Sequence, residues 1–115
     1  YVESDLINSY AWDTAIVYIQ AMGNSNYANA NRGTNTSLKN TGSTGDEKCK
    51  IFDMAGNTRE WTTEYSTYAV SSSARPCAYR GGGCNYSNYC TSYRGYNDAA
   101  FSTGYISFRP LLYVK

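Results

Sequence analysis

The chain has 115 residues and a formal net charge of +1, a length that predicts one domain with a modest core of its own. Its 10 basic and 9 acidic residues are scattered, so it lacks the basic stripe that nucleic-acid binding requires. No apolar run approaches the length of about 18 residues needed for direct insertion into a membrane. Because the sequence opens at Tyr1 rather than Met, we expect a processed product or the C-terminal part of a longer protein.

Two residue types narrow the range of functions. Histidine is absent, which removes the commonest general base and the commonest zinc ligand and leaves a serine nucleophile without its ordinary base. Tyrosine occurs 13 times, against 3 Phe and 2 Trp. Since a core would favour Phe, Leu and Ile, this excess of tyrosine indicates contact surface.

The four cysteines, Cys49, Cys77, Cys84 and Cys90, show no C-x-x-C spacing. An even count allows two disulfides in three connectivities. Without a visible secretory signal we expect mostly reduced thiols, although Cys84 and Cys90 could pair within one loop.

Residues 9–22 are predicted to form a helix. Ser9 is the expected N-cap, Trp12, Ala15, Ile16 and Ile19 fall on one face, and Gly23 stands where the helix would end. The simplest role for Trp12 is a core side chain.

Residues 24–47 are rich in Asn, Thr, Ser and Gly, and we expect a long loop that builds no core of its own. Two glycosylation sequons occur, at Asn35-Thr36-Ser37 and Asn85-Tyr86-Ser87, a pattern that is common by chance.

The rest of the sequence predicts short strands joined by loops. Apolar residues at 51, 52 and 54 precede a Gly56-Asn57 turn, and residues 60–62 resume a strand pattern. Residues 66–74 form a polar loop, and residues 78–80 and 106–114 read as strands. Pro110 must then lie at a strand end or a bulge, because it has no N–H to donate. Few helices and several short strands predict an α+β domain.

The segment from Gly83 to Ser107 has the composition of a binding surface. It contains five Tyr, is rich in Ser, Gly, Asn and Thr, and carries only two charges, Arg94 and Asp98. Tyrosine gives large, stiff contact area, whereas Ser, Gly and Asn give adaptable hydrogen bonding.

Three motifs occur in order: DMAGNTREWT from Asp53 to Thr62, Arg80-Gly81-Gly82, and Phe108-Arg109-Pro110. Together they resemble the C-terminal half of the formylglycine-generating-enzyme (sulfatase-modifying factor) type of C-type lectin-like fold. The helix start at residues 10–13 is similar to an earlier element of that family. The resemblance covers most of the chain and implies one domain, residues 1–115, with short strands, one or two helices and much irregular loop.

Some members of that family are oxidases that convert a cysteine to formylglycine. Others are binding proteins whose C-terminal segment is rewritten by a diversity-generating retroelement, often carried by a phage or prophage. The segment at about residues 83–107 lies between two frames, Arg80-Gly81-Gly82 and Phe108-Arg109-Pro110, and this arrangement resembles the second group. The resemblance implies that mutations arise at adenines of the retroelement's template, mainly in codons that can mutate to any residue except Lys, Glu, Gln, Met or Trp. Those five types occur 13 times in the other 90 residues and never in these 25.

The resemblance therefore implies a ligand-binding domain for receptor recognition or adhesion, with no enzymatic activity. The expected partner is a protein or glycan on a cell or phage surface, and the expected location is a phage virion or a bacterial cell surface. Ser92, Arg94, Ala99, Ala100, Ser102 and Ile106 are expected to be invariant scaffold. The candidate contact residues are Cys84, Asn85, Tyr86, Asn88, Tyr89, Cys90, Tyr93, Gly95, Tyr96, Asn97, Asp98, Phe101, Gly104 and Tyr105.

Residues outside the segment have expected scaffold roles. Arg80 and Arg109 would anchor its ends by hydrogen bonds to carbonyls or carboxylates, and the glycines after Arg80 would allow positive φ or close backbone approach. No cofactor is expected to be required. Relatives often bind structural calcium, which by resemblance would use Asn57 and Glu60. The alternative is that Asn57 forms a turn and Glu60 pairs with one of the two arginines.

The alternative function is a copper-dependent formylglycine-generating oxidase. That branch works through two cysteines, and soft thiolates would suit Cu(I). Cys84 and Cys90 are the candidates, but their C-x5-C spacing departs from the C-x4-C of that branch.

Overall fold

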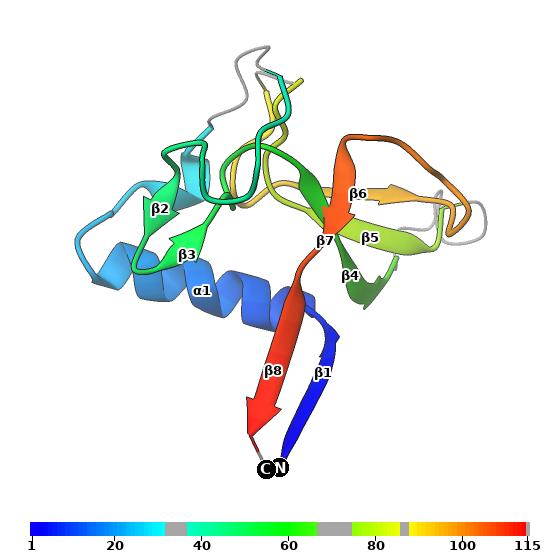
Figure 1. Ribbon diagram of the computed structural model, residues 1–115, viewed down its shortest axis with the longest axis horizontal. Helices are drawn as coiled ribbons and strands as arrows, with labels where there is room; N and C mark the ends of the chain where they lie inside the picture. Colours follow the sequence, from blue (N-terminus) through cyan, green and yellow to red (C-terminus); the bar gives the residue numbers. More distant parts are fainter. Residues whose placement is uncertain (32–36, 67–74, 86–87, 115) are drawn as a thin grey trace.

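The computed structural model of the protein describes residues 1–31, 37–66, 75–85 and 88–114. These residues form one α-helix, one short 3-10 helix and eight strands in three small sheets, which confirms the predicted α+β class (Figure 1). The first strand and the last strand pair with each other, and Val2 lies opposite Val114 at the tip of this two-stranded sheet (Figure 1). Among the described residues, no helix is long and apolar enough to cross a bilayer.

The helix α1 (Ser9–Ala21) lies in the predicted place and buries the predicted face. Trp12 and Ile19 are fully buried, Ile16 nearly so, and Ala15 is partly buried. The prediction of Ser9 as N-cap is wrong by one residue. The cap is Asn8, whose side-chain oxygen accepts from the backbone N–H of Ala11 at 2.8 Å.

The polar stretch after α1 contributes one aromatic side chain to the common core, a contribution that its composition did not predict. It includes η1 (Tyr27–Asn29), and Tyr27 is only 4% exposed. The Tyr27 hydroxyl donates to the buried carboxylate of Asp46 at 3.1 Å. This hydrogen bond accounts for burial of a tyrosine within a sequence that has few apolar residues.

A four-stranded sheet carries the C-terminal half. Its order is β6 (Arg94–Asn97), β5 (Cys77–Arg80), β4 (Arg59–Tyr65) and β7 (Ile106–Phe108). The strands predicted at residues 60–62 and 78–80 are confirmed. The pair β4–β7 is parallel, and the other two pairs are antiparallel. A short ladder of β2 (Glu47–Lys48) and β3 (Ile51–Phe52) lies above α1 in Figure 1.

The run predicted as one strand from 106 to 114 is two strands. β7 pairs with β4, whereas β8 (Pro110–Val114) leaves that sheet and pairs with β1 (Val2–Leu6) (Figure 1). Arg109 lies at the break between them. Pro110 is the first residue of β8, so its predicted position at a strand end is confirmed.

Three features predicted from the sequence lie partly outside the described residues. Residues 67–74 of the predicted polar loop are not described. Each sequon includes residues outside the described ranges, and so does the candidate segment at Tyr86.

Candidate functional site

The first frame of the candidate segment is fixed by Arg80, at the end of β5. Its side chain is 3% exposed, and its guanidinium Nη2 lies 2.5 Å from the carboxylate of Asp13 in α1. Its Nε donates to the carbonyl of Tyr93 at 3.2 Å, and the backbone N–H of Gly81 donates to the same carbonyl at 3.1 Å. One residue thus ties the segment to both the helix and the sheet.

The two glycines after Arg80 are required by packing. Gly81 has φ +90°, and a Cβ there would overlap the indole of Trp12. A Cβ on Gly82 would overlap the carbonyl of Ala55. The predicted need for positive φ and close backbone approach is confirmed at these positions.

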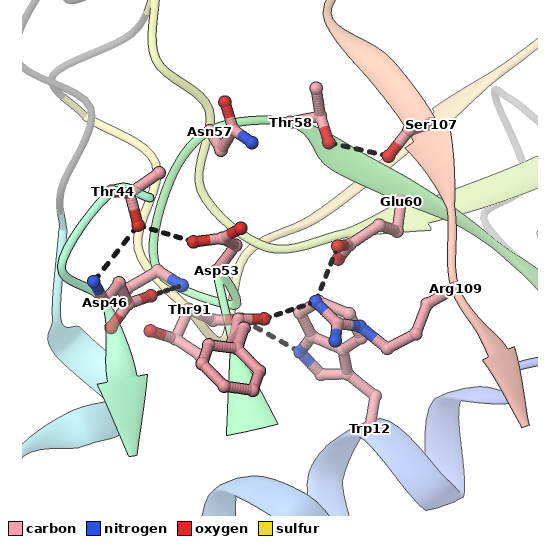
Figure 2. A network of polar contacts seen from close by, with 12 residues as sticks. Trp12, Thr44, Asp46, Asp53, Asn57, Thr58, Glu60, Thr91, Ser107 and Arg109 are labelled. Carbon is pink, nitrogen blue, oxygen red and sulfur yellow. Dashed lines mark hydrogen bonds and ion pairs between the residues drawn. The ribbon is translucent and has the colours of Figure 1, made fainter. Parts of the chain in front are cut away.

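The second frame is fixed by Arg109, between β7 and β8. Its Nη2 donates to the carbonyl of Phe52 and to the Oε1 of Glu60, both at 2.7 Å (Figure 2). The guanidinium also lies 5.7 Å from the centroid of the Trp12 ring. The predictions that both arginines anchor the segment, and that Glu60 pairs with one of them, are confirmed.

Glu60 is buried beneath this pair. Burial raises the pKa of its carboxyl to about 8, because the loss of hydration outweighs the favourable charge of Arg109. The negative charges of the nearby Asp53 and Asp46 carboxylates also raise the pKa of Glu60. Its second oxygen, Oε2, is buried and has no hydrogen-bond partner among the described residues.

The two residues expected to bind calcium line one cavity of about 210 Å³ but serve other partners. The side-chain oxygen of Asn57 accepts from the backbone N–H of Lys39, and its amide donates to the Lys39 carbonyl, both at 3.0 Å. Asn57 has φ +65°, so the predicted turn at this position is confirmed. Of the side-chain oxygens of Asn57 and Glu60, only Oε2 of Glu60 has no hydrogen-bond partner among the described residues. Ca²⁺ takes about six to eight oxygen ligands. The predicted pair does not fit a calcium site, and the described residues hold no cluster of three or more acidic or cysteine side chains suited to a metal.

A buried polar network continues from this cavity beneath the segment (Figure 2). Asp53 accepts from the hydroxyl of Thr44 at 2.5 Å, and Asp46 accepts from the backbone N–H of Ala55 at 2.7 Å. The indole of Trp12 donates to the carbonyl of Thr91 at 2.9 Å. The backbone of the segment is therefore held from below at Thr91 as well as at its ends.

Two tyrosines of the segment form one aromatic layer with Arg59 of β4 and Tyr79 of β5. The rings of Tyr89 and Tyr93 stack at 3.9 Å, and Tyr93 lies 6.3 Å from Tyr79 of β5. The guanidinium of Arg59 lies 5.0 Å from the Tyr79 ring and 5.5 Å from the Tyr89 ring. Burial, followed by contacts with the two neighbouring tyrosines, raises the pKa of Tyr93. Sequence reasoning missed Arg59 and Tyr79, since neither lies within the framed segment.

The candidate contact residues differ in their access to solvent. Tyr86 lies outside the described residues, and the others fall into three classes. The exposed candidates are Asn88, Asp98, Phe101, Gly104 and Tyr105. The half-buried candidates are Asn85, Tyr89, Cys90, Tyr93, Tyr96 and Asn97. Of the residues expected to be scaffold, Ser92, Arg94, Ala99, Ala100 and Ser102 are also exposed, so exposure alone does not separate the two sets.

Two candidates are buried, and their assignment to the contact surface is wrong. Cys84 is 1% exposed, and its backbone N–H donates to the carbonyl of Asn57 at 2.8 Å, which draws the residue inward. Gly95 lies under the ring of Tyr79, which fills the space that a side chain would need. The sequence places both among polar residues and gives no local sign of burial.

All four cysteines are free thiols, as expected. Burial raises the pKa of the Cys84 thiol above its ordinary value. The Sγ of Cys90 contacts the Ser92 hydroxyl at 3.3 Å. A thiol that resists ionisation is a poor nucleophile and a poor metal ligand near neutral pH.

Comparison with known proteins gives a family for most of the chain. The model of the sulfatase-modifying factor enzyme 1-like domain matches residues 3–109, which include α1, the arginines of both frames and the segment between them. A search of curated proteins and a search of solved structures found no match. The chain belongs to the sulfatase-modifying factor enzyme 1-like family.

Proposed function

We propose that this domain is a ligand-binding module of C-type lectin-like fold, used in receptor recognition or adhesion. Its binding surface is the segment between the two frames, and a retroelement diversifies that surface. Family membership supports the fold. The expected ligand is a protein or glycan on a cell or phage exterior.

One observation carries the proposal: the arginines of both frames are hydrogen-bonded into the fold, while the segment between them reaches solvent. Arg80 is 3% exposed, and Arg109, whose side chain is 22% exposed, donates to the buried carboxyl of Glu60. Between the two frames, five candidate residues are exposed and six are half-buried. A surface that is to vary without loss of folding needs this separation, because substitutions at exposed positions usually change stability by less than about 0.5 kcal/mol.

The aromatic layer adds a reason to expect binding at this surface. Tyr89 and Tyr93 are held by stacking on each other and by the ring of Tyr79 beneath. Rings fixed in this way lose little conformational entropy when a ligand binds. Truncation of such an anchor commonly costs an interface about 2 kcal/mol or more.

The alternative is an oxidase, because the family description names an enzyme. Its copper site would use Cys84 and Cys90. Against it stand the burial of Cys84, the raised pKa of its thiol and the contact of Cys90 with Ser92.

The coding DNA tests the proposal. We expect a near-copy of the stretch that encodes residues 83–107, differing almost only at adenines and lying beside a reverse-transcriptase gene. An identical sequence in every isolate would count against diversification. Titration with Cu(I) tests the alternative: the wild type and the Cys84→Ser variant should bind equally little copper, whereas one copper per chain that is lost in Cys84→Ser would favour the oxidase.

A further inference from the structure

A cleft of about 360 Å³, lined by both charged and aromatic side chains, lies at the N-terminal end of α1, between the helix and the outer half of β4. None of its lining residues belongs to the candidate contact set. Tyr10 and Asp13 come from α1, Glu64 and Tyr65 from β4, and Arg94 from the start of β6. Three elements that are far apart in sequence therefore build one site.

The charges in this cleft are matched. Arg94 Nε lies 3.2 Å from Glu64 Oε2, which also accepts from the hydroxyl of Ser9. Asp13 pairs with the buried guanidinium of Arg80 at 2.5 Å. Each carboxylate of the cleft is thus paired with a guanidinium group, Glu64 with Arg94 in the cleft and Asp13 with the buried Arg80 behind it, so no unpaired charge is left to select an anion or a cation.

The charged groups of the cleft keep some access to solvent. The side chains of Asp13, Arg94 and Glu64 are 52%, 41% and 21% exposed. Carboxylates only accept hydrogen bonds and guanidinium groups only donate them. A ligand that meets both kinds of group must donate and accept at neighbouring atoms, as a pair of hydroxyl groups does.

Two tyrosines supply apolar surface at the same place. Tyr10 is 87% exposed and Tyr65 is 64% exposed, and both line the cleft. An aromatic ring offers an apolar face together with a hydroxyl at its edge. The flat C–H face of a sugar ring fits such a surface, and its hydroxyl groups fit the charged groups beside it.

We propose that this cleft binds an uncharged polyhydroxylated ligand with the chemistry of a saccharide. Glu64 and Asp13 accept from its hydroxyl groups, Arg94 donates to them, and Tyr10 and Tyr65 pack against the ring faces. An apolar ligand would cover the charged groups without replacing their water, which is costly. The proposed contacts use protein side chains alone, so binding should require no metal ion.

This inference is independent of the proposed contact residues, since only Arg94, an expected scaffold residue, lies within the segment of residues 83–107. Its test uses three uncharged probes, maltotriose, cellotriose and chitotriose, added at millimolar concentration to the isotope-labelled protein. We expect at least one to receive saturation transfer in ligand-observed NMR and to shift the backbone amides around Tyr10 and Glu64. The shifts should persist in EDTA.

Matched variants locate the site. Tyr10→Ala and Glu64→Gln should each weaken binding by about tenfold, which corresponds to about 1.4 kcal/mol. Tyr18→Ala removes another exposed tyrosine of α1, away from the cleft, and should leave binding unchanged. The inference is overturned if none of the three probes binds, if EDTA abolishes binding, or if Tyr10→Ala and Tyr18→Ala bind equally well while both remain folded by circular dichroism.

Discussion

Arg109 and Glu60 lie 49 residues apart in sequence and meet through a 2.7 Å hydrogen bond that joins the end of the candidate segment to the central strand of the sheet. Arg109→Met removes this contact and the hydrogen bond to Phe52. We expect the free energy of unfolding to fall by about 3 kcal/mol, because the buried carboxyl of Glu60 and the carbonyl of Phe52 both lose their hydrogen-bond donor. Urea unfolding measures the change. Arg75→Met is the control, since Arg75 is exposed, and an equal loss in both variants would contradict the role given to Arg109.

The raised pKa of Glu60 predicts a dependence of stability on pH. Its folded pKa of about 8 lies above the ordinary value of 4.5, so between these values the folded state holds a proton that the unfolded state releases. Stability should therefore fall as pH rises from about 4.5 to about 8, and this contribution should level off above that range. In the Glu60→Gln variant this decrease in stability should be absent, because glutamine does not titrate. Denaturant unfolding across this range checks the prediction, and an unchanged slope in the variant would show that another group titrates.

The close packing around Gly82 predicts that two glycine-to-alanine substitutions differ in their effect on the free energy of unfolding. Gly82→Ala places a methyl group on the Ala55 carbonyl and should lower the free energy of unfolding by about 1–3 kcal/mol. Gly104→Ala meets nothing within 4 Å and should change it by less than about 0.5 kcal/mol. The urea concentration at the midpoint of unfolding, measured for both variants, checks this prediction. Equal midpoints would mean that the backbone beside Ala55 is not close-packed.

Thiol reactivity should separate the cysteines. Cys84 is buried and the pKa of its thiol is raised, whereas Cys49, Cys77 and Cys90 are half-buried. We expect three thiols to react with a disulfide reagent in the folded protein and Cys84 to react only on unfolding. Mass spectrometry of the labelled peptides identifies each thiol. Labelling of Cys84 as fast as Cys90 would place it at the surface after all.

The parts of the fold that follow from local sequence were predicted well. The buried face of α1 could be recognised from the spacing of Trp12, Ile16 and Ile19, and the position of Pro110 follows from its missing N–H. The split at Arg109 could not be predicted, because residues on either side of it pair with β4 and β1, which are remote in sequence.

The candidate site was less predictable than the fold. A Tyr-, Ser- and Asn-rich composition indicates a surface, but it does not show which residue the frame draws inward. Cys84 is buried by a backbone hydrogen bond to Asn57, and Gly95 is covered by the Tyr79 ring. Arg59 completes the aromatic layer through a contact of the folded chain that no local pattern encodes.

One measurement tests most directly whether stability resides in the frame rather than in the displayed residues. A variant with Ser at all five exposed candidate positions, residues 88, 98, 101, 104 and 105, should unfold cooperatively, with a total loss below about 2 kcal/mol. It should be clearly more stable than Arg109→Met. If the quintuple variant instead loses cooperative unfolding, or falls below Arg109→Met in urea midpoint, these residues are part of the fold and cannot be a freely variable surface.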